Sequence, residues 1–197
     1  ELHLSTQANT TNYLTAGFWC EQGVTRIVTA REMSLDEIKE MKKHLPEKIE
    51  IEAFVHGAMC ISYSGRCLLS NFMVGRDANQ GACTHPCRWK YALLEEKRPG
   101  EYYPIEEDTR GSYILNSRDL CMIHAIPDLI DAGVTSLKIE GRMKSMYYVA
   151  TVVSAYRSAL DDYLNNPEGY KFNENHYNEL CKASHREFTH GFYYNKP

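Results

Sequence analysis

The sequence lacks any apolar run close to the roughly 18 to 20 residues that span a bilayer, so no transmembrane helix is expected. It also lacks a secretory signal, because residues 1–6 (ELHLST) contain no basic region followed by an apolar stretch. No initiator Met is present, and the first residues read as part of a strand, so we expect residues to precede Glu1 in a longer parent chain. A cytoplasmic location without a membrane partner is therefore expected.

A large excess of charge of either sign is also missing. Lysine and arginine together number 22 and aspartate and glutamate 26, which gives a formal net charge of −4. The overall field of such a chain does not attract nucleic acid. A nucleic-acid substrate would therefore need a local basic patch or another domain.

Two hydrolase motifs are absent, since the chain contains neither His-Glu-x-x-His nor Gly-x-Ser-x-Gly. Ser64 has no candidate base at a telling spacing. A cysteine peptidase would need one thiol of low pKa paired with a histidine. The residues themselves thus give little support to a peptidase.

Cysteine is present, but not as a disulfide framework. Seven cysteines are an odd number, and no secretory signal accompanies them. Four of them gather in the pattern Cys60-x6-Cys67-x15-Cys83-x3-Cys87. Four thiolates complete the ligand shell of a [4Fe–4S] cluster or of a structural zinc ion. Four buried inert thiols are the plainer alternative; clustering in one irregular loop favours a metal, and spacing alone leaves cluster and zinc open.

The chain alternates short apolar strands with helical stretches, which is typical of a parallel α/β sheet or barrel. The expected strands are residues 2–5, 26–30, 49–55, 113–116 and 134–140. The expected helices are residues 10–22, 34–44 with a Ser34–Glu37 capping box, a stretch from Ser117 that Pro127 divides and Gly133 ends, 144–163, and 174–183.

About five βα units result, whereas a closed barrel needs eight, so either the sheet is open or three units are absent. The regular alternation fails between residues 56 and 111, a stretch rich in Gly, Cys, Arg and Asn. This segment follows the third strand, and parallel α/β folds place their active sites at the carboxyl ends of strands. We expect the chemistry there.

Five stretches of the sequence resemble the peptidase U32 family. They are residues 3–9 (HLSTQAN), 52–60 (EAFVHGAMC), 64–70 (SGRCLLS), 76–83 (RDANQGAC) and 136–144 (SLKIEGRMK). The resemblance covers nearly the whole chain.

The resemblance implies a TIM-type (β/α) barrel, here incomplete, with a long Cys-rich insertion after the third strand. Residues 1–164 would form the partial barrel with the Cys-rich loop 56–111, and residues 165–197 a C-terminal helix and tail leading to a small β domain. Relatives are expected to carry a [4Fe–4S] cluster, here on Cys60, Cys67, Cys83 and Cys87, with Cys121 as an alternative fourth ligand.

The resemblance also implies a reaction. Family members hydroxylate tRNA uridine, ribosomal RNA cytidine or a ubiquinone precursor without oxygen, with prephenate as hydroxyl source. The tRNA branch is the most similar. The expected partners are therefore tRNA or another RNA, a prephenate-like dicarboxylate and an unidentified redox partner. A collagenase-like U32 peptidase and a structural-zinc binding module are the alternatives.

Further candidate residues lie at the ends of the expected strands. Lys138, Glu140 and Arg142 end the strand 134–140, and Arg142 would bind a carboxylate through two hydrogen bonds. A strand-end salt bridge involving Glu140 is the plain alternative. We assign these three residues to catalysis.

His56 follows the third strand and is the fourth catalytic candidate, as an acid–base group. Arg66 and Arg76 in the Cys-rich loop, and Asn9 after the first strand, are the candidates for substrate binding. A structural role, in the core for His56 and within the loop for the arginines, is the alternative in each case.

Overall fold

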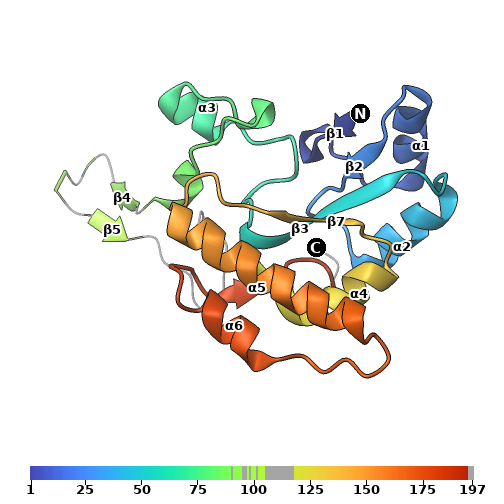
Figure 1. The fold of residues 1–197 in the computed structure, drawn as a ribbon. Coiled ribbons are helices and arrows are strands. Elements are labelled where there is room, and N and C mark those ends of the chain that lie inside the picture. Colours follow the sequence, from blue (N-terminus) through green and yellow to red (C-terminus); the bar gives the residue numbers. More distant parts are fainter. Residues whose placement is uncertain (90, 95–96, 98, 101, 105–117, 195–197) are drawn as a thin grey trace.

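The structure is a computed structural model that describes residues 1–89, 91–94, 97, 99–100, 102–104 and 118–194 (Figure 1). Its strands are β1 His3–Leu4, β2 Arg26–Val28, β3 Glu50–Ala58, β4 Ala92–Leu94, β5 Tyr102–Pro104, β6 Asp119–Cys121, β7 Ser136–Ile139 and β8 Phe188–Thr189. Its α-helices are α1 Tyr13–Glu21, α2 Leu35–His44, α3 Leu69–Val74, α4 Ile126–Asp131, α5 Met146–Asn165 and α6 Glu174–Leu180. Short 3₁₀ turns are η1 Thr6–Ala8, η2 Ala78–Gln80, η3 Pro86–Arg88 and η4 Ile123–Ala125.

Within the described residues, six strands form one sheet in the order β1-β2-β3-β6-β8, with β7 paired to β3. The pairs β1–β2, β2–β3, β3–β7 and β6–β8 are parallel, whereas β3–β6 is antiparallel. Strands β4 and β5 form a separate antiparallel pair. The α/β architecture is confirmed; a closed TIM-type barrel is neither confirmed nor excluded by these strands.

One face of β3 forms the core. Ile49, Ile51, Ala53 and Val55 are at most 3% exposed, as the period of two in the sequence predicts. Helices α2, α4 and α5 bury their apolar stripes in the same core, and on α5 this stripe is the predicted one (Tyr148, Val152, Ala155, Tyr156 and Ala159). The core therefore lies between the sheet and this layer of helices.

Helix α2 begins and ends where the sequence predicts. The Ser34 hydroxyl accepts a hydrogen bond from Glu37 N at 3.3 Å, and the Glu37 carboxylate accepts one from Ser34 N at 2.8 Å. This capping box satisfies two of the free N–H groups at the helix start. The helix ends at His44, two residues before Pro46.

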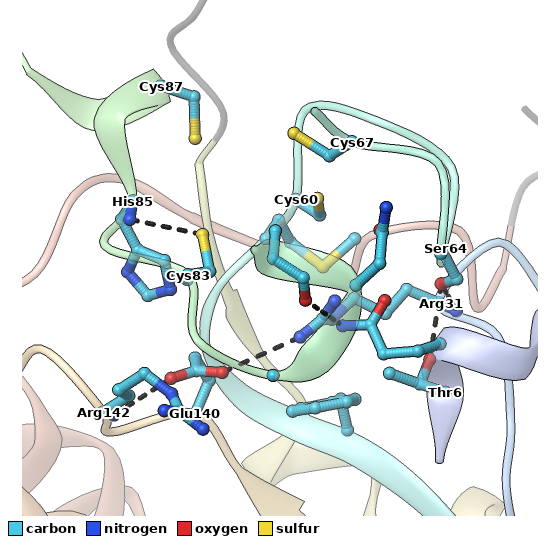
Figure 2. Close-up of a pocket in the computed structure, with 18 of the residues that line it drawn as sticks. Thr6, Arg31, Cys60, Ser64, Cys67, Cys83, His85, Cys87, Glu140 and Arg142 are labelled. Atoms are coloured by element: carbon cyan, nitrogen blue, oxygen red, sulfur yellow. Dashed lines mark hydrogen bonds and ion pairs between the residues drawn. The ribbon is translucent and has the colours of Figure 1, made fainter. Parts of the chain in front are cut away.

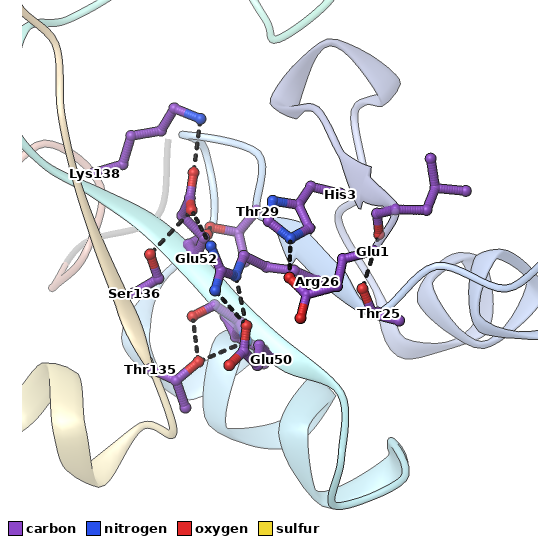
Figure 3. A network of polar contacts seen from close by, with 12 residues as sticks. Glu1, His3, Thr25, Arg26, Thr29, Glu50, Glu52, Thr135, Ser136 and Lys138 are labelled. Atoms are coloured by element: carbon purple, nitrogen blue, oxygen red, sulfur yellow. Dashed lines mark hydrogen bonds and ion pairs between the residues drawn. The ribbon is translucent and has the colours of Figure 1, made fainter.

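The other face of the sheet is polar. Figure 3 shows Arg26 of β2, Glu50 and Glu52 of β3, and Ser136 and Lys138 of β7 joined across neighbouring strands. Arg26 Nε donates to Glu50 at 2.6 Å, and Ser136 Oγ and Lys138 Nζ donate to Glu52 at 3.0 and 2.7 Å. These residues alternate with the core residues, so a continuous polar face runs along β3 and β7.

The prediction of a helix from Ser117 onward is wrong for the first half of that stretch. Residues 119–121 form β6, and η4 separates this strand from α4, in which Pro127 occupies the first turn. Leu120 and Cys121 are apolar and pair with the end of β3, so tertiary pairing overrides the local helical pattern. The expected strand 113–116 and Ser117 itself lie outside the described residues.

The C-terminal segment packs onto the same body as the rest of the described chain. Helix α6 contacts α5, and β8 pairs with β6. Strand β8 was not predicted, nor was α3 within the Cys-rich loop. Among the described residues, no helix combines the length and the apolar character that crossing a membrane would require.

Candidate functional site

A cavity of about 200 Å³ opens at the carboxyl ends of β3 and β7, and all four clustered cysteines line it (Figure 2). Cys60 and Cys67 come from the segment that follows β3, Cys83 from the segment between η2 and η3, and Cys87 from η3. Figure 2 shows these cysteines around one part of the cavity and Glu140 and Arg142 around another. The predicted convergence of the cysteine loop with the end of β7 is therefore present.

Two of the four thiols have raised pKa values. Burial raises the pKa of Cys87 to about 11, and Cys60, Cys83 and Cys67 add to this rise. Burial also raises the pKa of Cys60, with Cys67 and Cys83 among the contributing groups. None of the four is in a disulfide. A metal centre would replace the thiol protons, because metal binding requires the thiolate.

Four thiols are the donor chemistry of a metal centre, although their side chains are not arranged around one common position. Four cysteines line a single cavity, and His85 N donates a hydrogen bond to Cys83 Sγ at 3.3 Å, as N–H groups do to cluster sulfurs. As the side chains are placed, no group of three or more His, Cys, Asp or Glu residues in the described part of the chain could hold a metal ion.

One glycine lets two backbone segments approach closely at the site. Gly65 has φ +72°, and a Cβ there would lie 2.1 Å from the Gln7 carbonyl oxygen. The loop that carries Cys60 and Cys67 therefore packs directly on η1. Gln7 Nε2 also donates to Ala78 O at 3.0 Å, which joins η1 to the segment before Cys83.

Arg31 lies in the same cavity, although it was not among the residues predicted from the sequence. Its guanidinium lies 3.9 Å from the centroid of the Phe54 ring, and its Nη2 is 3.8 Å from Glu140 Oε2. Its Nε is buried and has no hydrogen-bond partner among the described residues. Its position in the sequence could have indicated this. Arg31 follows β2 as Arg142 follows β7, and the carboxyl ends of both strands lie at the same edge of the sheet.

Lys138 lines the cavity, but Glu52 neutralises it at 2.7 Å. Burial by itself raises the pKa of Glu52, yet the hydrogen bond and charge of Lys138, together with Ser136 and Arg26, bring that pKa below its ordinary value. The carboxylate is therefore ionised at neutral pH. The charge of Lys138 is therefore already paired with Glu52 inside the protein.

Arg142 is the more accessible cation. Its backbone N donates to Glu140 Oε1 at 2.9 Å, while its exposed side chain lines the cavity. In the part of the chain that the structure describes, no acidic side chain forms an ion pair with it. The Glu140 carboxylate thus contacts the backbone N of Arg142 and the side chain of Arg31, so both arginines flank one carboxylate.

None of the three residues predicted to bind substrate (Arg66, Arg76 and Asn9) lines the cavity. Arg66 and Arg76 are exposed on the outside of the Cys-rich segment. Asn9 ends η1 in the left-handed conformation (φ 51°), and its Oδ1 is buried without a partner among the described residues. Cys121 is buried in β6 next to Tyr156, also away from the cavity lining.

His56 is also absent from the cavity, and a β-bulge explains why. Opposite β7, Phe54 pairs with Lys138 but His56 pairs with Ile139, so β3 has one extra residue, Val55, at this point. Such an insertion moves the following side chain to the other face of the sheet. A strict alternation along β3 would place the His56 side chain on the same face of the sheet as Phe54. The bulge instead places it on the face of Ile139.

His56 therefore lies in the core. It is 1% exposed, and its ring lies against Tyr148, Tyr156 and Phe188. The Tyr156 hydroxyl lies 3.4 Å from its Nδ1. Burial lowers the pKa of His56 to about 4, although Asp119 opposes the shift. The ring is neutral at pH 7 and has the surroundings of a structural histidine.

This burial predicts a pH dependence of stability. The pKa of His56 is about 4 in the folded protein, against about 6.5 in an unfolded chain, so the contribution is complete above pH 6.5 and is lost as the pH falls toward 4. The free energy of unfolding should fall by about 2 kcal/mol between pH 7 and pH 5 from this group alone. Urea denaturation of His56→Gln at both pH values should lack this component, whereas exposed His190→Gln should follow the wild-type profile. Equal pH slopes for the two variants would contradict the assignment.

A buried carboxylate holds the turn that carries Cys87. Asp119 of β6 is 1% exposed, and Arg88 Nη1 lies 2.6 Å from its Oδ1. Arg186 N donates to its Oδ2 at 3.1 Å, and Lys144 Nζ lies 3.8 Å away. The residue adjacent to Cys87 is thereby tied to β6, to the start of α5 and to the C-terminal segment. Asp119 was missed because the sequence placed it in a helix.

Three similar proteins have names that refer to hydroxylation of RNA. The tRNA hydroxylation protein P1 of Bacillus subtilis (strain 168) is 45% identical over 197 residues, which are 100% of this chain and 46% of that protein. The tRNA hydroxylation protein P of Escherichia coli (strain K12) is 41% identical over 97% of this chain and 50% of its own length. The 23S rRNA 5-hydroxycytidine C2501 synthase of the same organism is 40% identical over 82% of this chain and 23% of its own.

The chain thus spans about half the length of the tRNA hydroxylation proteins it matches. No solved structure matches it. The sequence pattern of peptidase family U32 matches residues 1–197, so the resemblance seen in the sequence is confirmed. The chain belongs to peptidase family U32.

Proposed function

We propose that this chain is the part of an RNA-hydroxylating enzyme that holds a [4Fe–4S] cluster next to an anionic hydroxyl donor. One observation carries the proposal: the four cysteines line the same cavity as Arg31 and Arg142. The relatives named for hydroxylation of tRNA and of 23S rRNA cytidine support RNA as the substrate. A location in the reducing cytoplasm suits a centre held by free thiols.

Cys60, Cys67, Cys83 and Cys87 would hold the cluster, and when bound it would supply one-electron chemistry at the cavity. A structural zinc ion is the alternative for the same donors. The rest of the barrel would come from further βα units of the parent chain. Its active site would then lie at the carboxyl ends of the strands, where this cavity opens.

The donor we propose is a prephenate-like dicarboxylate. Arg142 would bind one carboxylate through its exposed guanidinium, and the buried Nε of Arg31 offers a second donor. Glu140 would orient both arginines, with which it is already in contact. Lys138 would hold Glu52 ionised and in place. An unidentified redox partner would also be required.

The cavity does not support a cysteine peptidase. A nucleophilic thiol needs a lowered pKa, whereas burial raises the pKa of both Cys60 and Cys87. Burial also lowers the pKa of the neighbouring His85, so this histidine is not an imidazolium that would stabilise a thiolate. The thiols suit metal binding better than nucleophilic attack.

The test is a comparison of tRNA nucleosides by mass spectrometry in cells that lack the parent gene. Hydroxylated uridine should disappear and return with the wild-type gene. Arg142→Ala should restore little of it, and Arg142→Lys only part, because lysine keeps the charge but cannot bind a carboxylate through two parallel hydrogen bonds. Hydroxylated nucleosides at the wild-type level in the deletion strain would refute the proposed function.

A further inference from the structure

The segment between Cys60 and Gly81 exposes large apolar side chains beside the cavity. Phe72 of α3 is 88% exposed, Leu68 is 68% exposed and Tyr63 is 63% exposed. Tyr63 and Leu69 also line the cavity itself. The segment therefore has an inner side toward the cysteines and an outer side toward solvent. We call the exposed residues Tyr63, Arg66, Leu68, Phe72 and Arg76 of this segment the α3 rim.

The geometry of α3 holds Phe72 outward. Ser70 is fully buried, and its hydroxyl lies 3.2 Å from Thr84 Oγ1 and accepts from Thr84 N at 3.1 Å. Residues two apart on a helix face nearly opposite directions, so anchoring Ser70 turns Phe72 to the solvent. Leu68 precedes Phe72 by four residues and lies on the same face. Figure 1 shows α3 at the periphery, well away from α5 and α6.

The charge of this segment differs from that of the chain. Residues 59–89 contain three arginines and one aspartate, within a chain of net charge −4. Arg88 is paired with the buried Asp119, which leaves Arg66 and Arg76 against Asp77, an excess of one positive charge. Arg66 and Arg76 are exposed and flank α3, so this part of an acidic chain offers two guanidinium groups to phosphates.

We propose that the α3 rim binds single-stranded RNA, with unpaired bases stacked on Phe72 and Tyr63 and phosphates on Arg66 and Arg76. The proposal rests on the proposed function and names the surface through which the RNA substrate reaches the cavity. Exposed aromatic rings interleaved with arginines are the usual means of holding unpaired bases. Tyr63 belongs both to the rim and to the cavity lining, so a base stacked there lies next to the cysteines.

The test is the binding of an unstructured oligouridine and of total bacterial tRNA to the purified chain, followed by fluorescence anisotropy. Phe72→Ala should weaken binding about tenfold, and Phe72→Trp should retain it. Arg66→Ala combined with Arg76→Ala should reduce the salt dependence of log K by about 0.7 for each phosphate that is no longer neutralised. Leu164→Ala and Arg157→Ala, an exposed apolar residue and an exposed arginine of α5, are the matched controls and should bind as wild type.

A second measurement does not depend on variants. Trypsin cleaves after Arg66 and Arg76, so residues 67–76 form one peptide that contains Phe72. Ultraviolet crosslinking to oligouridine should attach a nucleotide to this peptide. If the wild type binds RNA, the rim variants bind equally well and no adduct forms on residues 67–76, the α3 rim is not the RNA-binding surface. The proposed function would not be affected by that result. Absence of RNA binding by the wild type would count against the proposed function as well. Loss of self-association in Phe72→Ala at unchanged RNA affinity would assign the rim to a protein contact and overturn the proposal.

Discussion

Serine at position 60, 67, 83 or 87 is expected to abolish the cluster, while serine at position 20 or 181 leaves it intact. Anaerobically reconstituted wild type should be brown and bind about four irons per chain. Under the proposed function each of the four cavity cysteines would supply one ligand, and serine oxygen is a poor substitute for a thiolate toward iron. Cys20 and Cys181 do not line the cavity. Iron content and the visible absorption spectrum measure the effect.

Cys121→Ser separates the two candidates for the fourth ligand. Cys87 lines the cavity, whereas Cys121 is buried in β6 beside Tyr156, where burial raises its pKa to about 11. We therefore expect Cys121→Ser to keep its iron and Cys87→Ser to lose it. The opposite result would show that Cys121 is the ligand. A colourless protein with one zinc ion per chain would refute the cluster.

Much of this site could be predicted because it depends on local rules. The clustering of the four cysteines predicted that they come together, and their position after β3 predicted the end of the sheet at which their cavity opens. The rule that strand ends carry active-site residues predicted Lys138, Glu140 and Arg142 in the cavity lining. The same rule, applied to β2, leads to Arg31.

What could not be predicted depends on contacts between distant segments. The bulge at Val55 appears only in the pairing of β3 with β7, so no period within β3 could show that His56 turns into the core. Strand β6 is three residues long, and its partners are the end of β3 and β8. The ion pair of Lys138 with Glu52 likewise joins two strands, β7 and β3, that are far apart in the sequence. Nonlocal pairing of this kind leaves little trace in a short sequence window.

Alanine at position 57 is expected to cost the protein much more stability than alanine at position 23. Both glycines have positive φ, +101° and +91°, a conformation that costs other residues about 1 to 3 kcal/mol. Around Gly23 nothing lies within 4 Å of a new Cβ. At Gly57 the new Cβ would lie 2.3 Å from the Glu140 carbonyl oxygen, so the two variants differ chiefly by this clash.

The clash falls on backbone that has little room to move. Glu140 N donates to His56 O at 2.8 Å, and Gly57 pairs with Leu120 on β6, so β3 is held on both sides. Overpacking adds about 1 to 3 kcal/mol to the cost of the backbone conformation, for a total near 4 kcal/mol. Thermal unfolding should show Tm lowered by about 8 to 16 °C for Gly57→Ala and by about half as much for Gly23→Ala, which incurs only the backbone cost. Equal losses would mean that β3 and β7 do not approach as closely at Glu140 as the structure indicates, and that Glu140, with the two arginines it contacts, is free to shift relative to the cysteines.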